Sequence, residues 1–162
     1  QPVDIPSVNG LTTCVSQRIT VTLHHLVSVM DSFADEMLRA KHGMTFSQFE
    51  FLAAVAEYQP VDITTLARCL FVSKAAVSKR VPSLVEEGWI TTEGDPRHGR
   101  RVLLSLTPRA LRLVIQAGGG LDDQFTALFT DPRLGAEGID VAHLNSQLEI
   151  LMELVIEKGI PE

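Results

Sequence analysis

Basic residues are concentrated in one short stretch of the chain, and their spacing suits contact with a polyanion. Lys74 and Lys79 flank small residues in a segment of helical periodicity. Three arginines follow at positions 97, 100 and 101, in a stretch with nothing apolar to bury. Lysine and arginine bind phosphate oxygens, and small side chains between cations let a helix approach base edges. Residues 73–107 therefore have the chemistry expected of a segment that contacts double-stranded DNA.

A helix is predicted to begin after Ser73, a good N-cap residue, and to end before Gly88. Its apolar residues recur at three- and four-residue spacing and form one face: Val77, Val81, Leu84 and Val85. The residues left facing outward are Lys74, Ala75, Ala76, Ser78 and Lys79. Pro82 lies inside this helix and lacks a backbone donor, so we expect a bend after Ser78.

Two strands are expected after this helix, at residues 89–92 and 102–106, joined by an exposed loop at 94–101 that contains turn-forming glycines and a proline. The basic residues of the loop are Arg97, His98, Arg100 and Arg101. Upstream, Asp62 is a predicted N-cap for a support helix that ends at Leu70 and is followed by a short turn. An isolated basic loop is also typical of a solvated surface, but helix, turn, helix and hairpin in this order favour a winged helix-turn-helix.

The same stretch resembles the MarR family of winged-helix transcription regulators, most strongly over residues 44–112. The family's wing usually reads Asp-x-x-Asp-Arg-Arg, hydrophobic residues and Leu-Thr, and the segment DPRHGRRVLLSLT that starts at Asp95 fits it without a gap. The other matching positions are Leu66, Ala67, Leu70, Ser73, Val77, Ser78, Lys79, Leu84, Gly88, Trp89 and Ile90, and the segment 44–49 resembles the family's entry into its second helix.

The resemblance implies a mainly α-helical fold with a small β-hairpin wing, in which the second helix of the motif enters the major groove. It implies that Arg100 enters the minor groove, with Arg97 and Arg101 serving that groove and its phosphates. His98 and Gly99 stand where the family usually has Asp-Arg. The acidic partner that often steadies the arginine at the wing tip is therefore missing from its usual place.

The formal net charge of −6 is distributed unevenly along the chain. Residues 1–59 sum to −3, residues 60–115 to +4 and residues 116–162 to −7. The positive segment coincides with the predicted DNA-contacting motif, and the acidic remainder should repel phosphate elsewhere. We therefore expect salt-sensitive DNA binding despite the acidic composition.

The flanking segments are predicted to be long amphipathic helices. From about residue 14 to 41 the apolar stripe contains Val15, Ile19, Leu23, Leu26, Val27, Met30, Phe33, Met37 and Leu38. At the other end it contains Val141, Leu144, Leu148, Leu151, Leu154 and Val155. Part of each stripe should pack within the chain, and the rest should be buried in a homodimer, as the terminal helices are in the family. The expected regions are 1–43 and 113–162 for dimerisation and 44–112 for DNA contact, in one compact chain.

A further helix should begin at Pro108, with Thr107 as its cap, and then meet three consecutive glycines at 118–120. Three glycines cost a helix roughly 3 kcal/mol relative to alanines, so a break or a flexible joint is expected there. Two interpretations remain open, namely an ordinary turn and a hinge that sets the spacing of the two DNA-contacting units.

Other chemistry in the sequence is sparse. Cys14 and Cys69 lack zinc or CxxC spacing, so structural thiols are favoured over a redox-responsive site. No His-x-x-x-His pair places two ligands on one helical face, which disfavours a metal-responsive site, and no cofactor is expected. The residues that lie in plausible segments for a small aromatic or phenolic effector are His25, Phe46, Phe49 and Tyr58.

These observations predict a ligand-responsive repressor that binds a pseudo-palindromic operator as a homodimer in the cytoplasm. No apolar run approaches the ~20 residues of a membrane-spanning helix, so no membrane partner is expected. No catalytic triad, phosphate-binding glycine loop or paired-carboxylate site is recognisable, so an enzyme is not expected. The alternative is a winged helix that serves only as a protein-interaction module.

Overall fold

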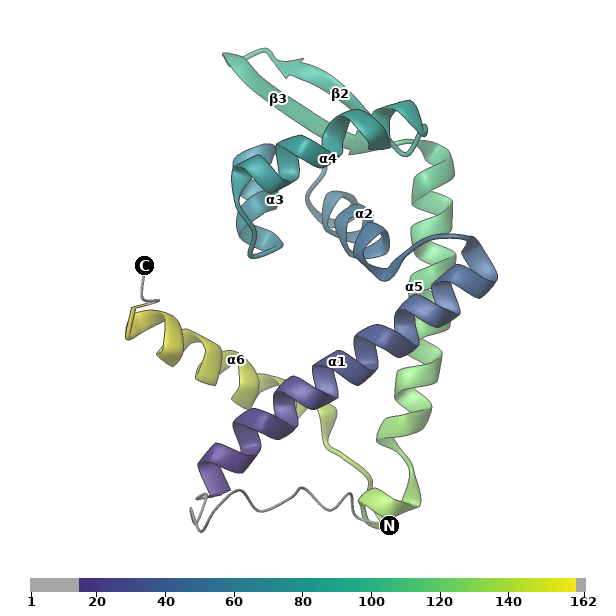
Figure 1. Ribbon diagram of the computed structural model, residues 1–162, viewed down its shortest axis with the longest axis vertical. Helices are drawn as coiled ribbons and strands as arrows, with labels where there is room; N and C mark the ends of the chain where they lie inside the picture. The colour runs from purple at the N-terminus through teal and green to yellow at the C-terminus, as the bar shows by residue number, and fades with distance from the viewer. Residues whose placement is uncertain (1–14, 160–162) are drawn as a thin grey trace, which may run out of the picture. The chain divides into compact units, whose positions relative to one another are not determined.

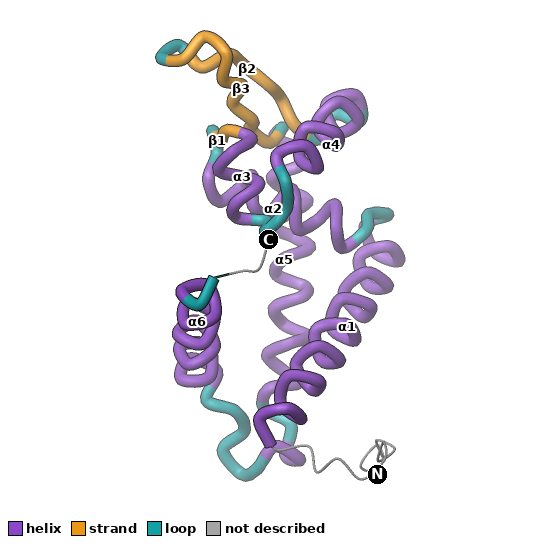
Figure 2. Tube along the Cα trace, turned by 60° about the vertical axis from the view of Figure 1, so that its left-hand side comes forward, coloured by secondary structure: helices purple, strands orange, loops and turns teal. Residues whose placement is uncertain are grey.

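The computed structural model describes residues 15–159, with side chains from residue 18 onward. Most of the described chain is helical, and its strands form one small sheet (Figures 1 and 2). The elements are α1 (Val15–His42), α2 (Phe46–Tyr58), β1 (Val61–Asp62), α3 (Ile63–Cys69), α4 (Lys74–Glu86), β2 (Ile90–Asp95), β3 (His98–Leu106), α5 (Pro108–Phe129), the short 3-10 helix η1 (Pro132–Leu134) and α6 (Val141–Glu157). The predicted fold class, mainly α with a small β-hairpin wing, is confirmed.

The chain divides into two compact units, with the boundary inside α5 between Val114 and Ile115. The core of the first unit is centred on α2, which contacts α1, α3 and β3. Phe51, Leu52 and Val55 of α2 are fully buried, because their three- and four-residue spacing places them on one helical face. Leu66 of α3 and Leu104 of β3 are also fully buried. This core fixes the support helix and the sheet to one scaffold.

Side-chain caps define where the helices of the first unit begin. The Oγ1 atom of Thr45 accepts a hydrogen bond from the backbone N–H of Gln48, and the Gln48 side chain accepts one from the backbone N–H of Thr45. This reciprocal pair is a capping box at the start of α2. Asp62 caps α3 and Ser73 caps α4, as the sequence predicted.

The sheet is antiparallel with the strand order β1-β3-β2. The two-residue strand β1 was not expected from the sequence, because it is too short to show a period-two pattern. The predicted loop at 94–101 was too long, because the structure continues the strands to Asp95 and from His98. Only Pro96 and Arg97 form the turn, and the Asp95 carboxylate accepts a hydrogen bond from the Arg97 backbone N–H at 2.9 Å.

Helix α4 continues through Pro82 as one helical segment. Val77 and Leu84 of its predicted apolar face are buried and Val81 is partly buried. Val85, the fourth residue of the predicted apolar face, is 40% exposed. Gly88 follows the helix with φ of +76°, a left-handed conformation that favours glycine and ends the helix as expected.

The predicted break at the three glycines was wrong, because α5 is continuous from Pro108 to Phe129. The Thr107 Oγ1 atom accepts a hydrogen bond from the Ala110 backbone N–H at 3.2 Å, which confirms the predicted cap. Ala117 and Leu121, on either side of the glycines, are buried. Burial of neighbouring residues offsets the low helix propensity of glycine, because tertiary packing supplies most of the stability of helices in proteins.

Gly119→Ala is expected to raise the free energy of unfolding by about 1 kcal/mol, because glycine is a poor residue in a helix interior. A Cβ atom at Gly119 would meet nothing within 4 Å, so the added methyl has room. Gly138→Ala is the matched contrast, because Gly138 has φ of +69° and its Cβ would lie 2.8 Å from the Phe129 carbonyl oxygen. Thermal denaturation of both variants should show opposite shifts in Tm; a lower Tm for Gly119→Ala would contradict a continuous, well-formed α5.

In the second unit, α6 buries none of its residues. Leu144, Leu148, Leu151 and Val155 lie along one helical stripe and are 38–57% exposed. No described helix is long and apolar enough to cross a membrane.

Candidate nucleic-acid interface

The outward face of α4 is placed as the sequence predicted. All of the assigned residues are exposed: Ser73, Lys74, Ala75, Ala76, Ser78 and Lys79. The Ser73 hydroxyl oxygen accepts a hydrogen bond from the Ala76 backbone N–H at 3.1 Å, so its proton remains available for a phosphate oxygen. The N-terminal half of α4 thus combines two ammonium groups, a hydroxyl and small side chains on one accessible surface.

Arg80, the third basic residue of α4, is engaged within the first unit. Its guanidinium carbon lies 4.8 Å from the centre of the Phe51 ring, and its Nη2 donates to the Ser47 carbonyl oxygen at 3.0 Å. Burial lowers the pKa of Arg80, while the nearby Glu50 opposes that shift. Burial, reinforced by the negative charge of Asp31, raises the pKa of Glu50. Arg80 therefore attaches α4 to α2, a role that its position in the sequence did not reveal.

A second guanidinium fixes the C-terminal end of α4. Arg109 of α5 lies over the Trp89 ring at 4.1 Å and donates to the Glu87 carbonyl oxygen at 2.6 Å. The Trp89 indole N–H in turn donates to the Glu87 carboxylate at 2.9 Å. These contacts join the end of α4, the start of the hairpin and α5, so α4 is held near its middle by Arg80 and at its C-terminal end by Arg109.

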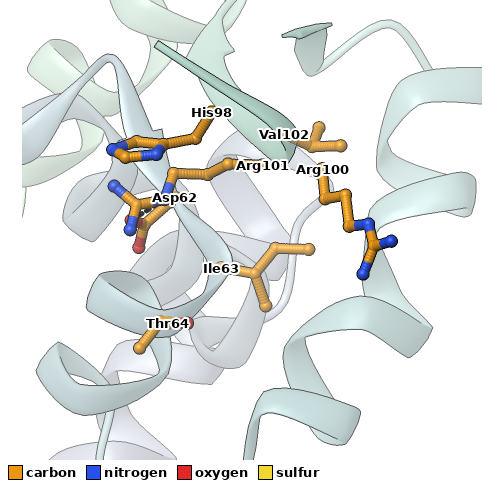
Figure 3. Close-up of a pocket in the computed structure, with 7 residues that line it drawn as sticks. All are labelled: Asp62, Ile63, Thr64, His98, Arg100, Arg101 and Val102. Atoms are coloured by element: carbon orange, nitrogen blue, oxygen red, sulfur yellow. Dashed lines mark ion pairs between the residues drawn. The ribbon is translucent and has the colours of Figure 1, made fainter. Parts of the chain in front are cut away.

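The hairpin of β2 and β3, residues 90–106, contains an irregularity where its arginines lie. Gly94 pairs with Val102 and Asp95 pairs with His98, so residues 99–101 of β3 have no cross-strand partner in this register. Such a bulge re-aims side chains relative to a regular strand. Figure 3 shows the Arg100 and Arg101 side chains extending in different directions from it.

Arg101 contacts the first residue before the support helix, although its side chain is 49% exposed. Its Nε lies 3.3 Å from the Oδ2 atom of Asp62, whose side chain is only 14% exposed (Figure 3). The other Asp62 oxygen accepts the capping hydrogen bond from the Thr65 backbone N–H at 2.7 Å. That hydrogen bond is the main reason why the pKa of Asp62 lies below its usual value, and the charges of Arg101 and Arg68 add to the effect.

A hollow of about 380 Å³ separates the hairpin from the start of α3. It is lined by Asp62, Ile63, Thr64, His98, Arg100, Arg101 and Val102 (Figure 3). Three basic side chains line the hollow, those of His98, Arg100 and Arg101, against one carboxylate, that of Asp62. The hollow is open, and its lining combines phosphate-binding groups with two apolar side chains.

Four of the predicted DNA contacts are exposed cations without a carboxylate partner in the described part of the chain: Lys74, Lys79, Arg97 and Arg100. Because no ion pair has to be broken, these groups are free to replace the counterions of a polyanion. His98 is exposed on the same hairpin.

The residues predicted for an effector site do not form one cluster. Phe46 and Phe49 lie one turn apart in α2, with stacked rings whose centres are 6.4 Å apart. Tyr58 lies twelve residues after Phe46 at the other end of α2, which is about 18 Å along the axis. Its pKa is raised chiefly by the negative charge of Glu57 and next by Cys69. His25 is exposed on α1.

One of the two cysteines lies within the described residues. Cys69 is a partly buried free thiol at the end of α3. Cys14 lies outside the described residues. Among the residues described, no three His, Cys, Asp or Glu side chains are grouped so that they could hold a metal ion.

A helix-turn-helix followed by an antiparallel hairpin, with cations on its second helix and on its hairpin, defines a winged helix-turn-helix. Residues 42–101 match the model of the MarR family. Over this region the chain is similar to the MarR family, in agreement with the resemblance of its wing residues.

Curated proteins of similar sequence are described as transcriptional regulators. A stretch of 78 residues is 27% identical to an uncharacterized HTH-type transcriptional regulator of Staphylococcus aureus. The match covers 48% of this chain and 53% of that protein, so the chain spans about half the length of the curated relatives it matches. The matched family and these relatives are described as regulators, not enzymes, in agreement with the sequence prediction.

Solved structures show the same fold over most of the chain. The transcriptional regulator BldR from Sulfolobus solfataricus superposes with a TM-score of 0.72 at 19% identity, covering 85% of this chain and 94% of that one. A MarR family regulator from Streptomyces coelicolor, solved in complex with DNA, superposes with a TM-score of 0.70 at 20% identity, covering 98% of this chain and 94% of that one. The resemblance therefore includes elements outside the winged helix.

Proposed function

We propose that this chain is a sequence-specific DNA-binding transcriptional repressor that acts as a homodimer on a pseudo-palindromic operator. One observation carries the proposal, namely the four cations on α4 and on the hairpin of a MarR-type winged helix that have no carboxylate partner among residues 15–159. In this arrangement α4 enters the major groove, where Lys74, Ser78 and Lys79 reach base edges and phosphates. Arg100 enters the adjacent minor groove, and Arg97 and His98 contact the flanking backbone.

The homodimer is supported by the apolar surfaces of the terminal helices. Ile19, Leu26 and Val27 of α1 are 50–55% exposed. The stripe of α6 is exposed over its whole length. A 17-residue helix gains most of its stability from packing, and an isolated chain would leave this surface in water. A second copy of the chain buries both surfaces and places two winged helices on adjacent turns of DNA, the geometry of a pseudo-palindrome.

Regulation by a small aromatic or phenolic effector is part of the proposal. An effector that binds better to one arrangement of the two winged helices shifts the population away from the arrangement that fits the operator. Phe46 and Phe49 are the favoured contacts among the predicted residues, because they are neighbours and partly buried. As a DNA-binding regulator, the protein acts where the chromosome lies, in the cytoplasm.

The salt dependence of operator binding tests the proposal. Four unpaired cations in each of two protomers give up to eight phosphate contacts, for which log K is expected to fall with log salt at a slope of up to about −7. Lys79→Ala removes one cation from each protomer and should make the slope about 2 units shallower. Fluorescence anisotropy across a range of salt concentrations measures both values. A slope near zero, or equal affinity for an unrelated duplex at every salt concentration, would contradict sequence-specific DNA binding.

A further inference from the structure

The two adjacent arginines of the hairpin occupy different environments, although both were expected from the sequence to contact the minor groove or its phosphates. Arg100 is exposed and has no carboxylate partner among the described residues. Arg101 is held by Asp62, which lies 39 positions earlier in the chain, at the boundary of β1 and α3. Both arginines belong to the residues 99–101 that have no cross-strand partner, and their side chains extend in different directions (Figure 3).

Asp62 occupies a junction of three elements. Its backbone pairs with Leu103 of β3, its Oδ1 caps α3 through the Thr65 N–H, and its Oδ2 contacts Arg101. The capping hydrogen bond fixes the orientation of the carboxylate, so the Arg101 guanidinium is attracted to a rigid anion rather than a mobile one. An ion pair with one prearranged partner loses less side-chain entropy than an ordinary surface pair.

We propose that Asp62 is a positioning residue for the DNA-contacting hairpin, that Arg101 is its anchor rather than a phosphate contact, and that Arg100 alone of this pair engages the DNA. The proposal replaces the expectation that both arginines serve the groove. Asp62 also supplies, from a different element, the acidic partner missing at the usual wing position. This positioning role of Asp62 depends on the proposed function only in the experiments that measure DNA binding.

Asp62→Asn is a selective variant, because asparagine caps a helix about as well as aspartate but carries no charge. Asp62→Asn and Arg101→Gln should each weaken operator binding about three- to tenfold, because a freed hairpin samples other directions. The double variant should be no weaker than either single variant, since both remove the same interaction. The salt slope should stay at its wild-type value in all three, whereas Arg100→Gln should make it about 2 units shallower for a dimer.

Hydrogen exchange of the hairpin amides provides a readout that needs no DNA. Asp62→Asn and Arg101→Gln should both accelerate exchange across residues 90–106, while Arg100→Gln should leave it unchanged. If the wild-type protein binds no operator, the proposed function fails but this exchange comparison still tests the anchor. The anchor is contradicted if Arg101→Gln flattens the salt slope as much as Arg100→Gln does, if Asp62→Asn tightens operator binding, or if neither anchor variant changes exchange.

Discussion

Leu148→Glu with Leu151→Glu in α6 is expected to convert the proposed dimer into a monomer and to weaken operator binding more than a hundredfold. Both side chains lie on the exposed apolar stripe of a helix that buries nothing within the described chain. Four carboxylates would then face one another across the dimer, without a partner for any of them. Loss of the second protomer also removes bivalent binding, which is worth a factor of about 10² to 10⁴ in affinity.

Sedimentation velocity measures the change of mass, and anisotropy with the operator measures the loss of affinity. Ser146→Glu is the matched control, because Ser146 is exposed on the opposite side of α6 from Leu148. It adds a carboxylate to the same helix and should leave both the mass and the affinity unchanged. A double variant that stays dimeric would show that α6 does not supply the interface.

Arg100→Ala is expected to weaken operator binding by about tenfold to a hundredfold for each wing that loses its contact. The side chain is exposed, has no carboxylate partner among the described residues and extends away from the Asp62–Arg101 pair (Figure 3). An arginine in a narrow minor groove gains from the concentrated negative potential there. Its removal should not change folding, since the guanidinium makes no ion pair within the part of the chain that the structure describes.

Arg112→Ala is the control for the loss of one positive charge. Arg112 is exposed on α5, outside the α4 surface and the hairpin. Its removal should lower affinity less than threefold, through the general field of the protein alone. Equal losses for Arg100→Ala and Arg112→Ala in anisotropy titrations would contradict the assignment of Arg100 to the groove.

The winged helix was predictable from the sequence because its signals are local. Ser73 and Asp62 are side-chain caps that act within three residues, and Gly88 ends α4 through its own backbone conformation. The apolar spacing of α4 then identified Val77 and Leu84, both of which are buried. Such signals require no knowledge of distant residues.

The features that the sequence did not reveal depend on distant contacts. The partner of Arg101 is Asp62, which only the pairing of β1 with β3 brings close. In the sequence Arg80 does not differ from a surface cation, because its contact with the Phe51 ring depends on the packing of α4 against α2. The bulge at residues 99–101 follows from strand register, which sequence spacing alone does not fix.

In helix α5 a local sequence signal led to a wrong prediction, because packing outweighed the helix propensity of the glycines. Three glycines do disfavour a helix, yet α5 continues through them between the buried residues Ala117 and Leu121. The low helix propensity of a short segment does not decide its structure when the helical turns on either side are packed against other residues. Val85 of α4 also fits the apolar spacing of its helix, yet it is 40% exposed.

A footprint of the protein on the promoter region of its own gene, at moderate salt, shows whether the protein binds an operator there. We expect protection of a pseudo-palindrome whose half-sites are centred about one helical turn apart, with protection lost in the Leu148→Glu, Leu151→Glu variant. Protection should also weaken in Arg100→Ala and remain in Arg112→Ala. Uniform weak protection of every sequence, or none for a folded protein, would contradict an operator-binding repressor.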